Sequence, residues 1–162
     1  MQERMVAVVR HGKAEPDSET GLDRDRPLRP KGEAQSRWLG ERLADMLEPR
    51  GTPIVVASPA RRADETARLI AEVLGVEVAY DDRLMVDAPA SGVLDLIASH
   101  AATALVLVGH NPQVSRLVGV LWGGTSAQGP AMRTGEVAVL TGRAGSPPGA
   151  WHLTETLRLA SD

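Results

Sequence analysis

Short apolar runs alternate along the chain with longer segments in which apolar residues recur at helical spacing. The runs rich in branched aliphatic residues lie at 5–9, 54–57 and 104–108, and their lengths are typical of buried strands. Helical spacing marks four longer segments, at 31–47, 62–74, 91–100 and 112–121. This alternation predicts helices on both faces of a largely parallel sheet.

The remaining apolar segments predict three further strands. Residues 76–80 form a short run, and 137–141 and 151–159 alternate apolar with polar positions across the Gly- and Pro-rich segment 142–149. We expect the last two to pair as antiparallel strands. Because no repeat or linker interrupts the pattern, we expect one domain over residues 1–162, folded as a three-layer α/β/α sandwich around a mostly parallel central sheet. Trp38 and Trp122 fall at apolar helical positions, so we expect both in the core.

Composition narrows the possible classes of protein. Hydrophobic residues make up 43% and charged residues 24% of the 162 residues, as in ordinary globular domains. The absence of cysteine excludes a disulfide scaffold, a thiolate metal ligand and a cysteine nucleophile. The net charge of -3 predicts no general affinity for nucleic acid. No stretch has the length of a membrane span or the character of a signal peptide, so we expect a cytoplasmic protein without a membrane partner.

Polar residues follow the ends of the three most strand-like runs. Arg10 and His11 follow the first run, Ser58 to Arg62 follow the second, and Gly109 and His110 follow the third. Ligands of open α/β sheets bind at the carboxyl ends of the strands. We therefore expect these residues to meet at one edge of the sheet, although they lie far apart in sequence.

The residue types at this edge suit transfer of a phosphoryl group. A histidine nucleophile must be neutral and held in one tautomer, and fixed cations must surround the transferred anion. A guanidinium group can meet two phosphate oxygens at once, and Arg10 and Arg62 would supply two such groups. His110 would add a donor, and Gly12 would let phosphate approach the backbone.

Three motifs in this order resemble those of the histidine phosphatase superfamily, whose fold is described as phosphoglycerate mutase-like. They are Val8-Val9-Arg10-His11-Gly12, Ser58-Pro59-Ala60-Arg61-Arg62-Ala63-Asp64-Glu65-Thr66 and Val108-Gly109-His110-Asn111-Pro112. The short chain and the segment Asp25-Arg26-Pro27-Leu28 are similar to the SixA-type phosphohistidine phosphatase branch. The resemblance runs from about residue 5 to residue 121.

The resemblance implies a role for each matching residue. His11 corresponds to the nucleophile that becomes phosphohistidine, with Arg10, Arg62 and His110 as the other catalytic residues. The motif spacing selects Arg62 over its neighbour Arg61. Further residues are expected to contact the substrate, and no metal or cofactor is implied; these residues are Gly12, Arg26, Asn111 and Ser58.

The chain departs from the family pattern at the residue that protonates the leaving group. Larger relatives carry a glutamate before the third motif, and Arg83 stands at about that place here. Asp82 or Asp87 could replace this acid. Alternatively, the substrate is one with an easy leaving group, such as the imidazole of phosphohistidine, which needs a weaker acid than an alkoxide. Both explanations stay open at this point.

The favoured function is a cofactor-independent phosphatase that forms a phosphohistidine intermediate and removes phosphate from phosphohistidine in proteins. The alternative is a phosphatase of small phosphorylated metabolites or nucleotides, although so short a chain leaves little room for lid loops. A catalytically silent phosphate-binding module is disfavoured because all four catalytic residues are present. A metal-dependent hydrolase is disfavoured because the histidines lack a local ligand spacing and two arginines would repel a cation. The oligomeric state stays open.

Overall fold

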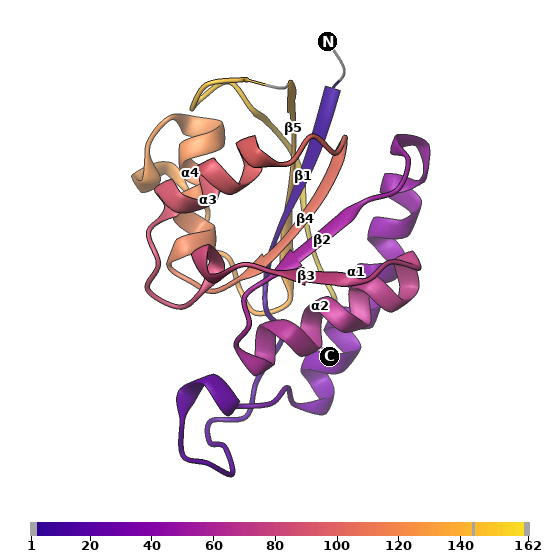
Figure 1. Ribbon diagram of the computed structural model, residues 1–162, viewed down its shortest axis with the longest axis vertical. Helices are drawn as coiled ribbons and strands as arrows, with labels where there is room; N and C mark the ends of the chain where they lie inside the picture. The colour runs from indigo at the N-terminus through magenta and orange to yellow at the C-terminus, as the bar shows by residue number, and fades with distance from the viewer. Residues whose placement is uncertain (1–2, 144, 161–162) are drawn as a thin grey trace.

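The described residues form six strands, all of which belong to one sheet at the centre of the molecule (Figure 1). The computed structural model describes residues 3–143 and 145–160, so the ends of the expected domain 1–162, and residue 144 within the expected turn, lie outside the described residues. The sheet has the order β3-β2-β4-β1-β5-β6. Its strands are β1 (Glu3–Arg10), β2 (Ile54–Ala57), β3 (Val78–Tyr80), β4 (Ala104–Gly109), β5 (Glu136–Arg143) and β6 (His152–Arg158).

Four neighbouring strands of the sheet are parallel. β1 pairs with β4, β4 with β2, and β2 with β3, all in parallel register. β5 runs antiparallel to β1 and β6 antiparallel to β5. The prediction of a mostly parallel sheet with antiparallel terminal strands is therefore confirmed.

Helices cover both faces of the sheet (Figure 1). α1 (Pro30–Leu47) and α2 (Arg61–Leu74) lie on one face, whereas α3 (Ala90–Ser99) and α4 (Gln113–Gly123) lie on the other. Alternate residues of β1 enter the two cores: Val6 and Val8 pack with α3 and α4, and Ala7 and Val9 pack with α1 and α2. This alternation follows from the two-residue period of a strand, and it confirms the three-layer sandwich.

Two differences from the expectations concern α4. α4 begins at Gln113 rather than at Pro112, and it continues to Gly123. Trp122 is 46% exposed, so its placement in the core was wrong. The buried face of α4 carries Val118 and Leu121. Because successive residues of a helix are about 100° apart around its axis, Trp122 points away from this face towards solvent. Trp38 is partly buried against the core beneath α1.

The chain between β1 and α1 leaves the sheet as a long loop whose two ends are joined. Ala14 and Leu28 form an antiparallel bridge, the Glu15 N–H donates to the Pro27 carbonyl at 2.8 Å, and the Arg29 N–H donates to the Lys13 carbonyl at 2.8 Å. We call residues 15–27 the strap. Its tip contains the 3₁₀ turn η1 (Asp23–Asp25), which contacts α2. Further 3₁₀ turns are η2 (Glu48–Arg50), η3 (Asp82–Leu84) and η4 (Ser126–Gln128).

A helix that crosses a membrane must be both long and apolar. None of the helices within residues 3–143 and 145–160 meets both requirements.

Candidate active site

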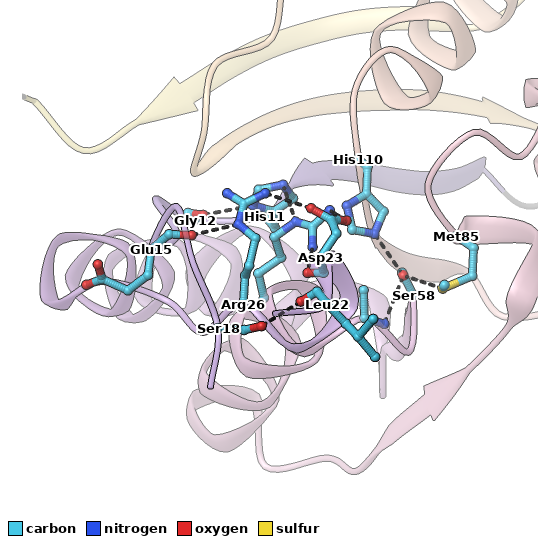
Figure 2. Close-up of polar contacts among 12 residues, drawn as sticks. His11, Gly12, Glu15, Ser18, Leu22, Asp23, Arg26, Ser58, Met85 and His110 are labelled. Carbon is cyan, nitrogen blue, oxygen red and sulfur yellow. Dashed lines mark hydrogen bonds and ion pairs between the residues drawn. The ribbon is translucent and has the colours of Figure 1, made fainter. Parts of the chain in front are cut away.

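The carboxyl ends of the parallel strands meet at a polar cavity of about 280 Å³. His11 follows β1, His110 follows β4, and Arg62 is the second residue of α2. The structure brings these three side chains and Arg10 together in the lining of this cavity. Figure 2 shows the two imidazoles near one another, and their ring centroids are 5.2 Å apart.

His11 is held in one tautomer by its own loop. Its Nδ1 lies 2.8 Å from the Gly12 carbonyl oxygen, and because a carbonyl only accepts, Nδ1 carries the proton. The lone pair is therefore on Nε2, which accepts from Nε of Arg62 at 3.3 Å. Burial and then the nearby positive charges of Arg62 and Arg10 lower the pKa of His11 to about 4, against a raising effect of the Gly12 hydrogen bond. The imidazole is therefore neutral at neutral pH, as a nucleophile must be.

His110 is positioned by a residue of the second motif. Its Nε2 lies 2.8 Å from the hydroxyl of Ser58, which also lies 3.3 Å from the sulfur of Met85 (Figure 2). Burial and then the neighbouring His11 lower the pKa of His110 to about 3. Among the described residues, Nδ1 of His110 finds no hydrogen-bond partner, so this atom is available to a ligand in the cavity.

The structure separates the two adjacent arginines of the second motif. Arg62 is 4% exposed, and beyond His11 it donates to the Asp23 carbonyl at 2.9 Å and to the Asp23 carboxylate at 3.0 Å. Arg61 is exposed and pairs with Glu65 at 2.9 Å. The geometry therefore agrees with the choice of Arg62 over Arg61 for the cavity.

Arg10 enters the cavity from the end of β1. Its Nη1 donates to the Met132 carbonyl at 3.1 Å, and its Nε has no partner among the described groups. Burial and then the positive charge of Arg158 lower the pKa of Arg10 below its usual value.

Two of the four expected substrate contacts line the cavity. Arg26 does so while its Nε donates to the Glu15 carbonyl at 2.7 Å (Figure 2). Asn111 also lines it, but both ends of its amide are already bonded, at 2.7 Å to the Met132 carbonyl and at 2.7 Å to the Ser115 hydroxyl. These bonds make Asn111 a residue that orients the loop after β4.

The other two expected contacts lie behind the cavity. Ser58 is 0% exposed and is covered by His110, so it supports that imidazole instead of meeting a substrate. Gly12 donates its N–H to the Thr66 hydroxyl at 3.0 Å, so this N–H is not available to bind a ligand. A Cβ at Gly12 would lie 2.7 Å from the Gly32 carbonyl oxygen. The glycine is thus required by its packing against α1, a reason different from the one we expected.

The structure places neither Asp82 nor Asp87 in the lining of the cavity, and both are exposed. In the segment 82–87, Leu84 of η3 lies in the core, and Val86 after η3 lines the cavity. Arg83 pairs with Asp81 at 2.8 Å, away from the lining. This side of the cavity is therefore apolar and carries no carboxyl group to act as an acid.

Several groups of the site were not found from the sequence. Lys13, Val86 and Thr134 line the cavity, and the Met132 carbonyl accepts from both Arg10 and Asn111. Every residue has a backbone carbonyl, so the residue type does not show which carbonyl accepts a hydrogen bond in the site. Asp23 did offer a signal, because it lies just before the Asp25-Arg26-Pro27-Leu28 segment. Within the described part of the chain, no three His, Asp or Glu side chains gather closely enough to hold a metal ion.

Comparison with known proteins agrees with this geometry. The sequence model described as Histidine phosphatase superfamily (branch 1) matches residues 6–85. A probable phosphoglycerate mutase GpmB of Enterobacter sp. strain 638 is 36% identical over 81 residues, or 49% of this chain and 36% of the relative. The corresponding protein of Salmonella paratyphi C is 33% identical over 81 residues, with the same shares of both chains. The matched part thus spans about a third of the length of these curated relatives.

Similar solved structures cover nearly the whole chain. The putative phosphohistidine phosphatase SixA from Agrobacterium tumefaciens has a TM-score of 0.78 and 25% identity, covering 97% of this chain and 99% of its own. The protein histidine phosphatase SixA complexed with tungstate has a TM-score of 0.76, and a mycobacterial glucosyl-3-phosphoglycerate phosphatase has one of 0.69. The tungstate complex is 24% identical to this chain and covers 95% of it and 96% of its own chain. The mycobacterial phosphatase is 22% identical and covers 94% of this chain and 98% of its own. At these identities, both structures show the fold alone. The three motifs gather at one cavity of a sandwich that has the fold of these structures, and over residues 6–85 the chain is similar to the histidine phosphatase superfamily.

Proposed function

We propose that this protein is a phosphatase that transfers a phosphoryl group to Nε2 of His11 and then to water. The observation that carries the proposal is the state of His11. Its imidazole has a lowered pKa of about 4, its Nδ1 proton is held by the Gly12 carbonyl, and its Nε2 lone pair lies beside the Arg62 guanidinium. A neutral, oriented nucleophile next to fixed cations is the arrangement that phosphoryl transfer requires.

In the first step, Nε2 of His11 attacks phosphorus while the bond from phosphorus to the leaving group breaks. The electron pair of that bond goes to the leaving group, which then takes up a proton. Arg62, Arg10 and Nδ1 of His110 are placed to bind the phosphoryl oxygens, whose charge they offset. In the second step, water attacks phosphorus, the P–N bond breaks, and inorganic phosphate and neutral His11 are regenerated.

The proposed substrate is phosphohistidine carried by a partner protein. Among the described residues, none that lines the cavity has a carboxyl side chain, and an imidazole leaving group has less need of an acid than an alkoxide has. The A. tumefaciens relative that covers 97% of this chain is itself described as a putative phosphohistidine phosphatase. A small phosphorylated metabolite is the second candidate, supported by the curated relatives described as probable phosphoglycerate mutases.

The proposal is tested by turnover and by trapping of the intermediate. We expect the wild type to release phosphate from a phosphohistidine-bearing protein faster than from small phosphomonoesters. Acid-labile, base-stable phosphate should be trapped on the enzyme after a brief quench. His11→Ala should lower turnover by about a thousandfold or more and abolish trapping, because the nucleophile is lost.

Three results would contradict the proposal in different ways. Full turnover by His11→Ala would remove His11 as the nucleophile. Faster turnover of small phosphomonoesters would favour the second candidate substrate. Loss of activity with EDTA would favour metal-dependent chemistry, whereas we expect activity to survive the chelator. Circular dichroism of the variant verifies that the fold is kept.

A further inference from the structure

Asp23, at the tip of the strap, bonds two of the three cavity arginines, Arg26 and Arg62. One carboxylate oxygen lies 2.9 Å from Nη1 of Arg26, and the other lies 3.0 Å from Nη2 of Arg62. The Asp23 carbonyl also accepts from Nη1 of Arg62 at 2.9 Å. In Figure 2 the side chain points towards the end of the site where His11 and His110 lie. One residue thus bonds two guanidinium groups through three oxygen atoms.

The contacts occupy a particular edge of the Arg62 guanidinium. An arginine presents one pair of parallel N–H groups at its end, from Nη1 and Nη2, and another pair along its side, from Nε and Nη2. Asp23 takes the end pair. The side edge faces the nucleophile, since Nε of Arg62 lies 3.3 Å from Nε2 of His11. The edge left for a phosphoryl group is therefore the one that already points at the attacking atom.

We propose that Asp23 is a positioning residue, which holds the outer edge of Arg62 so that the inner edge meets the phosphoryl group at His11. The inference rests on the proposed function, because it requires that Arg62 binds this group. The same carboxylate holds Arg26, whose Nε is fixed by the Glu15 carbonyl. Its charge also reduces the repulsion among Arg62, Arg26 and the other cations of the cavity.

Asp23 is suited to a direct test because its side chain is 59% exposed and fills no part of the core. Asp23→Asn keeps the shape and the backbone contact to Arg62 but replaces one carboxylate oxygen with a donor. We expect the affinity for inorganic phosphate, measured by calorimetry, to fall about tenfold, or about 1.4 kcal/mol. The matched control is Asp17→Asn, which removes the same charge from an exposed residue of the strap and should leave this affinity unchanged.

A double-mutant cycle separates positioning from a general effect on the strap. Arg62→Lys cannot present a guanidinium edge, so Asp23 has nothing to orient in that variant. If Asp23 acts through Arg62, Asp23→Asn should weaken phosphate binding in the wild type but hardly at all in Arg62→Lys. Melting curves should show every variant folded.

The remaining outcomes overturn the inference. If Asp23→Asn lowered the phosphate affinity equally in the wild type and in Arg62→Lys, Asp23 would act on the strap and not through Arg62. Unchanged or tighter phosphate binding by Asp23→Asn would also overturn it, and in the tighter case the carboxylate would compete with the ligand. In these cases weak binding by Arg62→Lys would leave the proposed function standing. If the wild type and Arg62→Lys both failed to bind phosphate, the proposed function would fail together with the inference.

Discussion

At the scale of single residues, the site depends on hydrogen bonds that fix which atoms of the two imidazoles are free. The Gly12 carbonyl leaves Nε2 of His11 unprotonated. The Ser58 hydroxyl bonds Nε2 of His110 at 2.8 Å, which leaves Nδ1 as the ring nitrogen without a partner among the described residues. Ser58 is fully buried, so under the proposed function it would act on the substrate only through His110.

Removal of the Ser58 hydroxyl tests this role. We expect Ser58→Ala to lower kcat about tenfold, since His110 loses the bond that orients it, and to lower the free energy of unfolding by about 1–2 kcal/mol. Steady-state kinetics and urea unfolding measure the two effects. Ser58→Thr keeps the hydroxyl and should retain more activity than Ser58→Ala. If the two variants were equally active, the hydroxyl would have no part in orienting His110.

At the scale of elements, the loop after β1 is pressed against the first turn of α1. A Cβ at Gly32 would overlap the Lys13 carbonyl oxygen, which accepts from the Arg29 N–H at 2.8 Å. The neighbouring Gly12 meets the same helix turn. This close approach of two backbones sets the direction in which the chain leaves His11.

Two glycines at the same position of different helices make a matched pair for testing this contact. Gly32 and Gly92 are each the third residue of their helix, in α1 and α3. We expect Gly32→Ala to lower the free energy of unfolding by about 2 kcal/mol through overpacking, and to lower activity by displacing the loop. The nearest atom to a Cβ at Gly92 lies 3.5 Å away, so Gly92→Ala should be neutral or stabilising by up to about 1 kcal/mol. Chemical unfolding measures both, and equal stability of the two variants would contradict the contact.

Much of this element scale was predictable from the sequence. The apolar runs located β1, β2 and β4 to within about two residues, because burial of a parallel strand on both faces requires a continuous apolar segment. Pairing of distant groups was less predictable. The Gly12–Gly32 contact depends on the path of the strap, and no periodic pattern of residues records such a path.

At the scale of the whole molecule, burial of two neutral histidines couples stability to pH. The folded-state pKa values of His11 and His110 are lowered to about 4 and about 3 from 6.5. Between pH 6.5 and pH 4 the unfolded chain therefore binds more protons than the folded one. The folded state loses stability as pH falls through this window and regains it as pH rises above 6.5.

The size of this coupling can be measured by replacing one histidine. We expect each buried histidine to lower the free energy of unfolding by about 2 kcal/mol on going from pH 7 to pH 5. His11→Asn retains a donor for the Gly12 carbonyl but removes the titrating group, so its loss of stability over this range should be smaller by that amount. Urea unfolding at the two pH values makes the comparison. An identical loss in the wild type and the variant would show that His11 does not carry the coupling.

The sequence by itself determined the alternation of strands and helices, the parallel centre of the sheet and the edge at which Arg10, His11 and His110 would meet. These features follow from hydrophobic periodicity and from the alternation of strands and helices along the chain, which are both local patterns. The tertiary structure alone decided which groups face the cavity and what holds them: it withdrew Ser58 and both candidate acids from the lining, and it placed Asp23 against the cavity arginines Arg26 and Arg62. The physical reason is that loop paths and backbone carbonyls position these groups, and neither leaves a residue pattern along the chain.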